Sequence, residues 1–159
     1  MKREAVEASI RGLKQAGIDF ISILPDSDWA EVQRAAMKDD AFQCVSVSNE
    51  AIGVGVCAGA WLGGKKPAML IPTAGIMAAA FSLTTLNMQK NIPVLMLVPY
   101  RGSLGDGIWF MDLITLPRSR CLEIYRSPIA SWTRSMKLCR PSRGHNFRRR
   151  LGCNLRLCC

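Results

Sequence analysis

The stretch Phe42–Leu62, with the sequence FQCVSVSNEAIGVGVCAGAWL, contains the pattern that decides the fold class. Its first six residues, 42–47, are mostly apolar and have the length of a buried strand. Asn49 and Glu50 then open an apolar helix, rich in Gly and Ala, that continues to the end of the stretch. A buried strand followed closely by an apolar helix predicts one unit of an α/β fold.

The same alternation extends in both directions along the chain. The predicted elements are strands 20–24, 42–47, 68–71 and 92–98 and helices 5–16, 29–37, 49–62 and 75–89. Strands that are apolar on both faces indicate a parallel sheet with helices on both sides. Ligands of such sheets bind at the carboxyl ends of the strands. The loops that follow the strands, and that we expect to form the site, are 25–28, 48–50, 72–75 and 100–106.

The composition of the chain changes near Phe110. Residues 1–110 hold 10 Lys and Arg against 10 Asp and Glu, whereas residues 111–159 hold 11 against 2, so the net charge of +9 comes from the second part. We therefore expect an α/β domain over 1–110, incomplete at its end, followed by an irregular, poorly ordered basic tail over 111–159 that is rich in Arg and Cys. A change of reading frame near Phe110 would explain the tail, and a solvated basic arm is the alternative.

Several classes of protein are disfavoured by the sequence. The charged start of the chain has no signal-peptide pattern, which favours a cytoplasmic, reduced protein in which Cys44 and Cys57 are small core residues. The uncharged run 67–89 is long enough for a bilayer, but eight of its residues are polar or helix-breaking, so we expect no membrane span. His145 is the only histidine, and no metal-ligand spacing or Ser-His-Asp order is present.

The glycines of the helix 49–62 match a dinucleotide-binding pattern in spacing only. The series from Gly53 to Gly59 fits G-x-G-x-x-G, but that motif requires its first glycine in the turn directly after a strand. Here the residues 48–52 intervene. We therefore predict that these glycines form one small-residue helix face for close packing.

Several segments of the first 110 residues resemble the pyrimidine-binding domain of thiamine diphosphate enzymes. Within that superfamily the likeness is strongest to sulfopyruvate decarboxylase alpha subunits and phosphonopyruvate decarboxylases. The segments that carry it are 47–53, 59–67, 82–87, 92–98 and 100–102. The family's Gly-Asp-Gly metal motif is matched at 105–107 only in part, because the Asn pair that closes it is missing, and we interpret 105–107 as a polar turn.

The resemblance implies a cofactor, a partner and a set of site residues. Glu50 matches the glutamate that faces the aminopyrimidine ring of thiamine diphosphate, and the loop with Asp26 and Ser27 matches one near the substrate. In the turn after the third strand, Thr73 and Gly75 are the cofactor-binding candidates, although only Gly75 is retained from the Asn-Ser-Gly-x-Gly-Asn turn of the relatives. Mg²⁺ and the diphosphate are expected to be held by a diphosphate-binding (beta) subunit.

The chemistry of the cofactor gives Glu50 a specific task. Activation of the thiazolium carbon requires a proton on the far nitrogen of the pyrimidine ring, and a carboxyl group in an apolar site supplies it. Without the resemblance, Glu50 would be interpreted as a first-turn residue that complements the helix dipole, an effect of about 0.3–1 kcal/mol.

These observations lead to one main hypothesis and two alternatives. The main hypothesis is the pyrimidine-binding (alpha) subunit of a thiamine diphosphate-dependent decarboxylase that acts on a 2-oxo acid bearing a sulfonate or phosphonate. The first alternative is a noncatalytic remnant of such a subunit. The second, which the position of the charge disfavours, is a basic nucleic-acid-binding protein.

Overall fold

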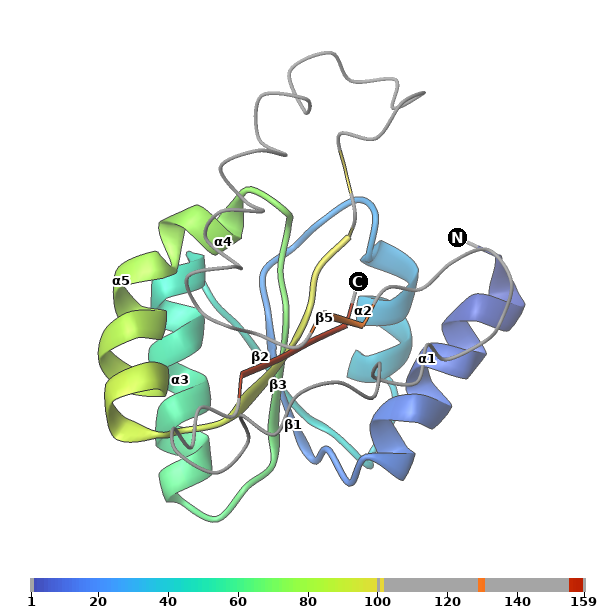
Figure 1. Ribbon diagram of the computed structural model, residues 1–159. Coiled ribbons are helices and arrows are strands. Elements are labelled where there is room, and N and C mark those ends of the chain that lie inside the picture. The colour runs from blue at the N-terminus through green and yellow to red at the C-terminus, as the bar shows by residue number, and fades with distance from the viewer. Residues whose placement is uncertain (1, 100, 102–128, 131–154, 159) are drawn as a thin grey trace, which may run out of the picture.

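A parallel sheet lies between two layers of helices in the computed structural model, which describes residues 2–99, 101, 129–130 and 155–158 (Figure 1). Its first four strands are β1 (Phe20–Ile23), β2 (Gln43–Ser46), β3 (Pro67–Leu70) and β4 (Val94–Leu97). All pairings are parallel, and the strand order in the sheet is β2-β1-β3-β4-β6-β5. The predicted fold class is therefore confirmed.

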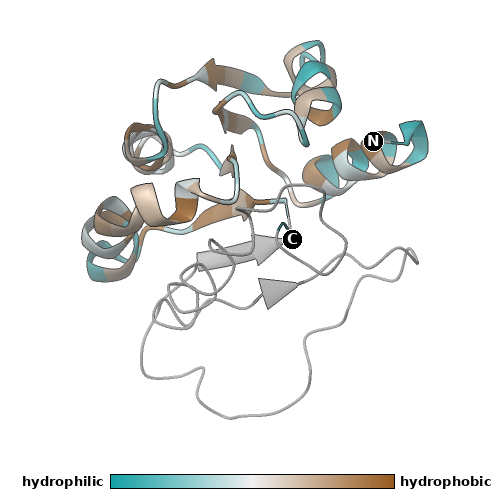
Figure 2. Cartoon of the chain, turned by 90° about the horizontal axis from the view of Figure 1, so that it is seen from above, coloured by the Kyte–Doolittle hydropathy of each residue, from teal (hydrophilic) through white to brown (hydrophobic). Residues whose placement is uncertain are grey.

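The helices divide between the two faces of the sheet, as the view from above shows (Figure 2). The helices α1 (Arg3–Gln15) and α2 (Ala30–Met37) pack together on one face. The other face is covered by α3 (Glu50–Leu62), α4 (Gly75–Ala78), α5 (Ala80–Ser82) and η1 (Leu83–Met88). The two-sided cover explains why β1 and β3 are apolar except for Ser22, since every one of their residues is buried.

Side chains of successive strand residues enter the two cores alternately. In β3, Ala68 and Leu70 belong to the core on the side of α1 and α2, whereas Met69 belongs to the core beneath α3 and η1. The edge strand β2 is different, because its two end residues are exposed. This placement fits an edge position, where only one neighbouring strand covers the chain.

The glycines of α3 occupy two faces of the helix, so the prediction of one small-residue face is wrong. Gly53 packs on the sheet, where a Cβ atom would lie 2.6 Å from the Met69 Cε and 3.3 Å from the Val47 Cγ2. Gly55 and Gly59 would have no such neighbour within 4 Å. A step of two residues turns a helix by more than half a revolution, which places Gly53 and Gly55 on different sides.

The predicted helix 75–89 is divided into α4, α5 and η1, and η1 is a π-helix. Two threonine hydroxyls compete for backbone carbonyls in this segment: Thr84 donates to the Ala80 carbonyl oxygen and Thr85 to that of Phe81, both at 2.9 Å. Such bonds from side chain to backbone are known to disturb helices locally.

Two short strands, which the sequence did not predict, extend the sheet beyond β4. The strand β6 (Leu155–Cys158) pairs with β4, and β5 (Ile129–Ala130) pairs with β6. Strand β5 has only two residues, and the Arg-rich composition around β6 hides its apolar residues. The rest of the predicted tail, and with it the prediction of poor order, lies outside the described residues.

A helix that crosses a membrane must be long and apolar over most of its length. None of the described helices is both long and apolar enough to cross a membrane.

Candidate active site

The strand order places a topological switch point between β1 and β3. The chain runs from β1 outward to β2 and then crosses back over β1 to β3, so β1 lies between the two. The connection after β1 leads to α2 on one face and the connection after β3 leads to α4 on the other, and ligands of such sheets typically bind where two connections diverge in this way. The loops that follow β1, β2, β3 and β4 all emerge at the carboxyl edge of the sheet.

Glu50 is the first residue of α3 and lies against the turn that follows β3. The helix start is fixed by Asn49, whose side-chain oxygen accepts the Ile52 amide at 2.9 Å. A Cβ atom at Gly75 would lie 2.6 Å from the Cδ of Glu50, a separation that real Cβ atoms do not reach. Glycine at position 75 therefore leaves the space that the Glu50 side chain occupies.

Glu50 is partly buried. Within the described part of the chain, no hydrogen bond or ion pair reaches its carboxylate. An acidic group that is half removed from water would normally be paired or hydrogen-bonded if its role were structural. Glu50 and Gly75 were both predicted site residues, and the structure brings them into contact.

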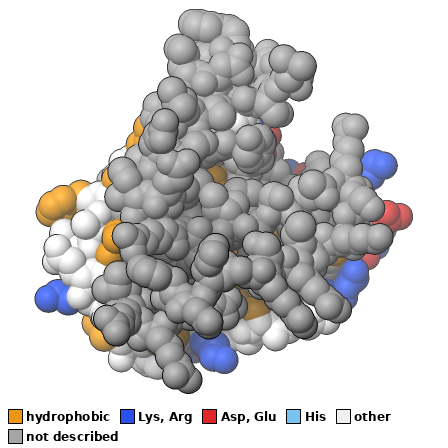
Figure 3. Space-filling model, in the orientation of Figure 1, with side chains coloured by type: hydrophobic (Ala, Val, Ile, Leu, Met, Phe, Trp, Pro, Cys, Tyr) orange, Lys and Arg blue, Asp and Glu red, His pale blue; other side chains and the backbone are white. Residues whose placement is uncertain are grey.

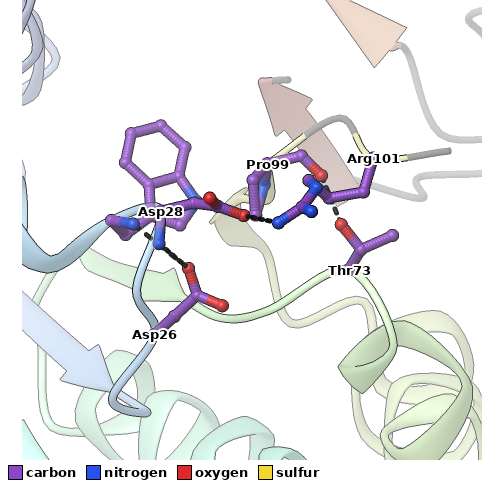
Figure 4. A network of polar contacts seen from close by, with 6 residues as sticks. Asp26, Asp28, Thr73, Pro99 and Arg101 are labelled. Atoms are coloured by element: carbon purple, nitrogen blue, oxygen red, sulfur yellow. Dashed lines mark hydrogen bonds and ion pairs between the residues drawn. The ribbon is translucent and has the colours of Figure 1, made fainter. Parts of the chain in front are cut away.

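Thr73, the third predicted cofactor residue, uses its side chain within the protein. It is 3% exposed, and its hydroxyl donates a hydrogen bond to the carbonyl oxygen of Pro99. This bond ties the turn after β3 to the loop after β4 (Figure 4). A direct contact of Thr73 with the cofactor stays a prediction.

The two predicted substrate residues lie in a different part of the same edge. Asp26 Oδ1 accepts the amides of Asp28 at 2.8 Å and Trp29 at 3.1 Å, so it shapes the turn before α2. Asp26 and the exposed Ser27 line an open depression of about 490 Å³ with Ala30, Gln33 and other residues of β1, α2 and β2. Glu50, Thr73 and Gly75 do not line it. The predicted residues therefore form two groups, and a substrate contact of Asp26 or Ser27 stays a prediction.

An ion pair at this edge was missed by the sequence analysis. The Arg101 Nη1 lies 2.6 Å from the Asp28 Oδ2, and both side chains are partly buried (Figure 4). The two residues are 73 positions apart, and only the order of the strands shows that their loops meet. The spacing of the sequence therefore contains no signal for this contact.

Cys44 and Cys57 are unsuited to nucleophilic chemistry. Burial raises the pKa of the Cys57 thiol to about 12 and also raises that of Cys44. A thiol reacts as its thiolate, so Cys57 is inert at neutral pH. The described residues contain no group of three or more His, Cys, Asp or Glu side chains that could hold a metal ion.

Comparison with known proteins gives a consistent set of relatives. The chain is 36% identical over 135 residues to the sulfopyruvate decarboxylase subunit alpha of Methanothermobacter thermautotrophicus, covering 80% of each chain. It is 32% identical over 104 residues to the same subunit of Methanococcus maripaludis, covering 65% of this chain and 62% of that one. A phosphonopyruvate decarboxylase of Streptomyces viridochromogenes is 27% identical over 97 residues, which are 61% of this chain and 24% of that protein.

A solved structure supports the fold. A 2-oxoglutarate:ferredoxin oxidoreductase from Magnetococcus marinus aligns with a TM-score of 0.51 at 22% identity, covering 58% of this chain and 16% of that one. The family described as "Thiamine pyrophosphate enzyme, N-terminal TPP binding domain" matches residues 3–110, which is more than half of the chain; thiamine pyrophosphate is another name for thiamine diphosphate. The resemblance in the sequence is thereby confirmed, and the chain belongs to this family of N-terminal thiamine pyrophosphate-binding domains.

Proposed function

We propose that this chain is the pyrimidine-binding (alpha) subunit of a thiamine diphosphate-dependent decarboxylase, and that its substrate is a 2-oxo acid bearing a sulfonate or phosphonate group. The names of the relatives support this reaction class. The chain spans 62% of the length of the Methanococcus maripaludis subunit, so the activity of that whole protein is part of the proposal. The observation that supports it most is the Glu50 side chain, which lies against Gly75 and has no hydrogen bond or ion pair among the described residues.

The residues around Glu50 fit the pyrimidine ring of the cofactor. Gly75 leaves room for the Glu50 side chain, and the core next to it is apolar, with Val54, Met69 and Ile76 fully buried. Thiamine diphosphate, when bound, supplies the electron sink that decarboxylation of a 2-oxo acid needs. Glu50 would hold a proton on its carboxyl group and share it with the ring nitrogen that it faces. Gly75 would keep that carboxyl group in place.

A second chain is needed in this proposal, and the subunit designation of the relatives supports it. We assign Mg²⁺ and the diphosphate of the cofactor to this partner, the diphosphate-binding (beta) subunit. The two chains would then close one site between them, with the cofactor ring against Glu50.

The outer face of α3 is our candidate for the surface that this partner covers. After Glu50 the helix carries no charge, and Ile52 and Leu62 are 48% and 76% exposed. Gly55 and Gly59 leave room for a neighbouring helix. Hydrophobic side chains reach the surface at the left of the molecule, the side on which Figure 1 shows α3 and α5 (Figure 3). A helix that is apolar all round is normally buried on all sides.

The proposed function is tested by reconstitution with the beta subunit. Release of CO₂ would be measured from 3-sulfopyruvate, 3-phosphonopyruvate and pyruvate, with and without thiamine diphosphate and Mg²⁺. We expect release from one of the two substituted acids, dependent on the cofactor and faster than from pyruvate. A complex that binds the cofactor and releases no CO₂ from any of the three acids would instead favour the noncatalytic remnant.

A further inference from the structure

The Asp28–Arg101 ion pair joins two loops at the carboxyl ends of the strands. Asp28 lies in the loop after β1 and Arg101 in the loop after β4, while β3 stands between these strands. The contact of 2.6 Å therefore passes over the end of β3. The turn after β3 is held to the same β4 loop by the bond from Thr73 to Pro99, and that turn also seats Glu50 on Gly75.

An anionic ligand that binds among these loops needs a positively charged side chain, because the loops carry mostly negative charge. The described residues of the loops after β1 to β4, with Glu50, include three carboxylates, and Arg101 is the basic residue among them. A 2-oxo acid carries at least one negative charge, and repulsion by carboxylates would oppose its entry. A guanidinium has five N–H donors in one plane, so it can hold the Asp28 carboxylate and a second acid group together.

We propose that Arg101 binds an acid group of the substrate and that Asp28 is the residue that positions its guanidinium. The inference rests on the proposed function, because it takes the ligand to be a 2-oxo acid. Arg101 is only 18% exposed on its side chain, so its geometry is restricted before the substrate arrives. A restricted side chain loses less conformational entropy on binding, which favours tight recognition.

Binding is measured first, by calorimetric titration of 3-sulfopropanoate into the reconstituted complex. This probe has both acid groups of 3-sulfopyruvate and no keto group, so it binds without reacting. A hydrogen-bonded ion pair typically contributes enough affinity that Arg101→Gln should weaken binding about 10- to 100-fold. Arg101→Lys keeps the charge and loses the planar fork, so we expect an intermediate loss. Arg3→Gln, which breaks the surface pair of Arg3 with Glu7 in α1, is the matched control and should bind as the wild type does.

The KM values for pyruvate and 3-sulfopyruvate then identify the acid group. A KM that rises for both in Arg101→Gln assigns Arg101 to the carboxylate, and a rise for 3-sulfopyruvate alone assigns it to the sulfonate. Unchanged KM values and an unchanged affinity for 3-sulfopropanoate would overturn the proposal. If Arg101→Gln does not assemble with the beta subunit, Arg101→Lys takes its place. A wild-type affinity of Arg101→Lys for 3-sulfopropanoate would then overturn the proposal.

The two proposals fail in different ways. A wild-type complex that binds 3-sulfopropanoate through Arg101 and releases no CO₂ would reject the proposed function and keep the anion site. A complex that releases CO₂ with wild-type KM values in Arg101→Gln would keep the function and reject the anion site.

Discussion

Glu50 has two candidate roles, one in stabilising the start of α3 and one in binding the cofactor. A carboxylate in the first turn of a helix stabilises the helix by about 0.3–1 kcal/mol through the macrodipole. That effect does not need a glycine opposite the side chain, and Asn49 already caps the helix start. The contact with Gly75 and the absence of a partner for the carboxylate in the described residues therefore point to a ligand.

The variant Glu50→Gln separates the two roles of this residue. It keeps the shape of the side chain and removes the acid, so hydrogen exchange at the thiazolium carbon should slow by about 10²–10⁴-fold in the reconstituted complex. The free energy of unfolding should fall by less than about 1 kcal/mol. Exchange would be followed by NMR with both proteins at equal cofactor occupancy, and equal rates would end the assignment of a catalytic role.

The variant Gly75→Ala tests the contact between Glu50 and Gly75 without changing the acid. The new Cβ would occupy the position of the Glu50 side chain, which must rotate away. We expect CO₂ release to fall at least 10-fold, because a displacement of about 1 Å at a reacting group can cost about 10²-fold in rate. Gly12→Ala is the matched control, since its Cβ would meet no atom within 4 Å. Wild-type turnover in Gly75→Ala would show that the contact has no role in the reaction.

Some of these site residues were predicted from the sequence and others were not. Glu50 and Gly75 were predicted through the resemblance, and the fold then brought them together. The pair of Asp28 and Arg101 could not be predicted, because no local pattern connects residues on loops that meet only through the strand order. Thr73 was predicted as a cofactor residue, and its hydroxyl is used by Pro99.

At the scale of elements, α3 is the segment on which both the fold and the proposed assembly depend. Its inner face approaches the sheet so closely at Gly53 that a methyl group would overlap the Met69 side chain. Its outer face is apolar and uncharged. One helix therefore packs on the sheet of its own domain and, in our proposal, offers a surface to another chain.

The variant Gly53→Ala measures the inner contact. Alanine is favoured over glycine in a helix by about 0.8–1 kcal/mol, but overpacking a core costs about 1–3 kcal/mol. We expect a net loss of stability in urea unfolding, whereas Gly12→Ala in α1 should be stabilised. Equal gains in both variants would show that Met69 yields without cost.

The variant Gly55→Leu tests the outer face of α3. No atom lies within 4 Å of a Cβ at this position, and leucine favours a helix more than glycine does, so the isolated chain should keep or raise its melting temperature. Leucine would fill the space left for a partner helix, and association with the beta subunit should weaken by about 1–3 kcal/mol. Sedimentation of the mixture gives the affinity, and undiminished association would place the interface elsewhere.

The elements themselves were predicted well where the apolar pattern is long. All four strands β1 to β4 were predicted, with ends that differ by one or two residues, because buried strands stand out against their turns. The division of helix 75–89 was not predicted, since it depends on threonine hydroxyls that bond to the backbone. Strand β5 has only two residues, and β6 lies in a basic stretch without the longer apolar run that surrounds β1 to β4.

At the scale of the whole molecule, the sequence predicted the class of fold and not the order of its strands. That order results from a crossover of the chain from β2 to β3, which no spacing in the sequence specifies. The boundary predicted near Phe110 stays a prediction. The match to the Methanothermobacter thermautotrophicus subunit covers 80% of the chain and so continues beyond residue 110. The nucleotide sequence after codon 110 would show whether and where the reading frame changes.

The central claim is that this chain supplies only the pyrimidine side of a shared thiamine diphosphate site. It is tested most directly by calorimetric titration of thiamine diphosphate with Mg²⁺ into this chain, into the beta subunit and into their mixture. Each protein alone leaves half of the cofactor in water, so we expect weak or no binding to either. The mixture should bind the cofactor tightly and in a metal-dependent way, and Gly55→Leu should weaken this binding whereas Gly12→Ala should preserve it. Tight, metal-dependent binding by this chain alone, or no binding by an assembled mixture, would contradict the claim.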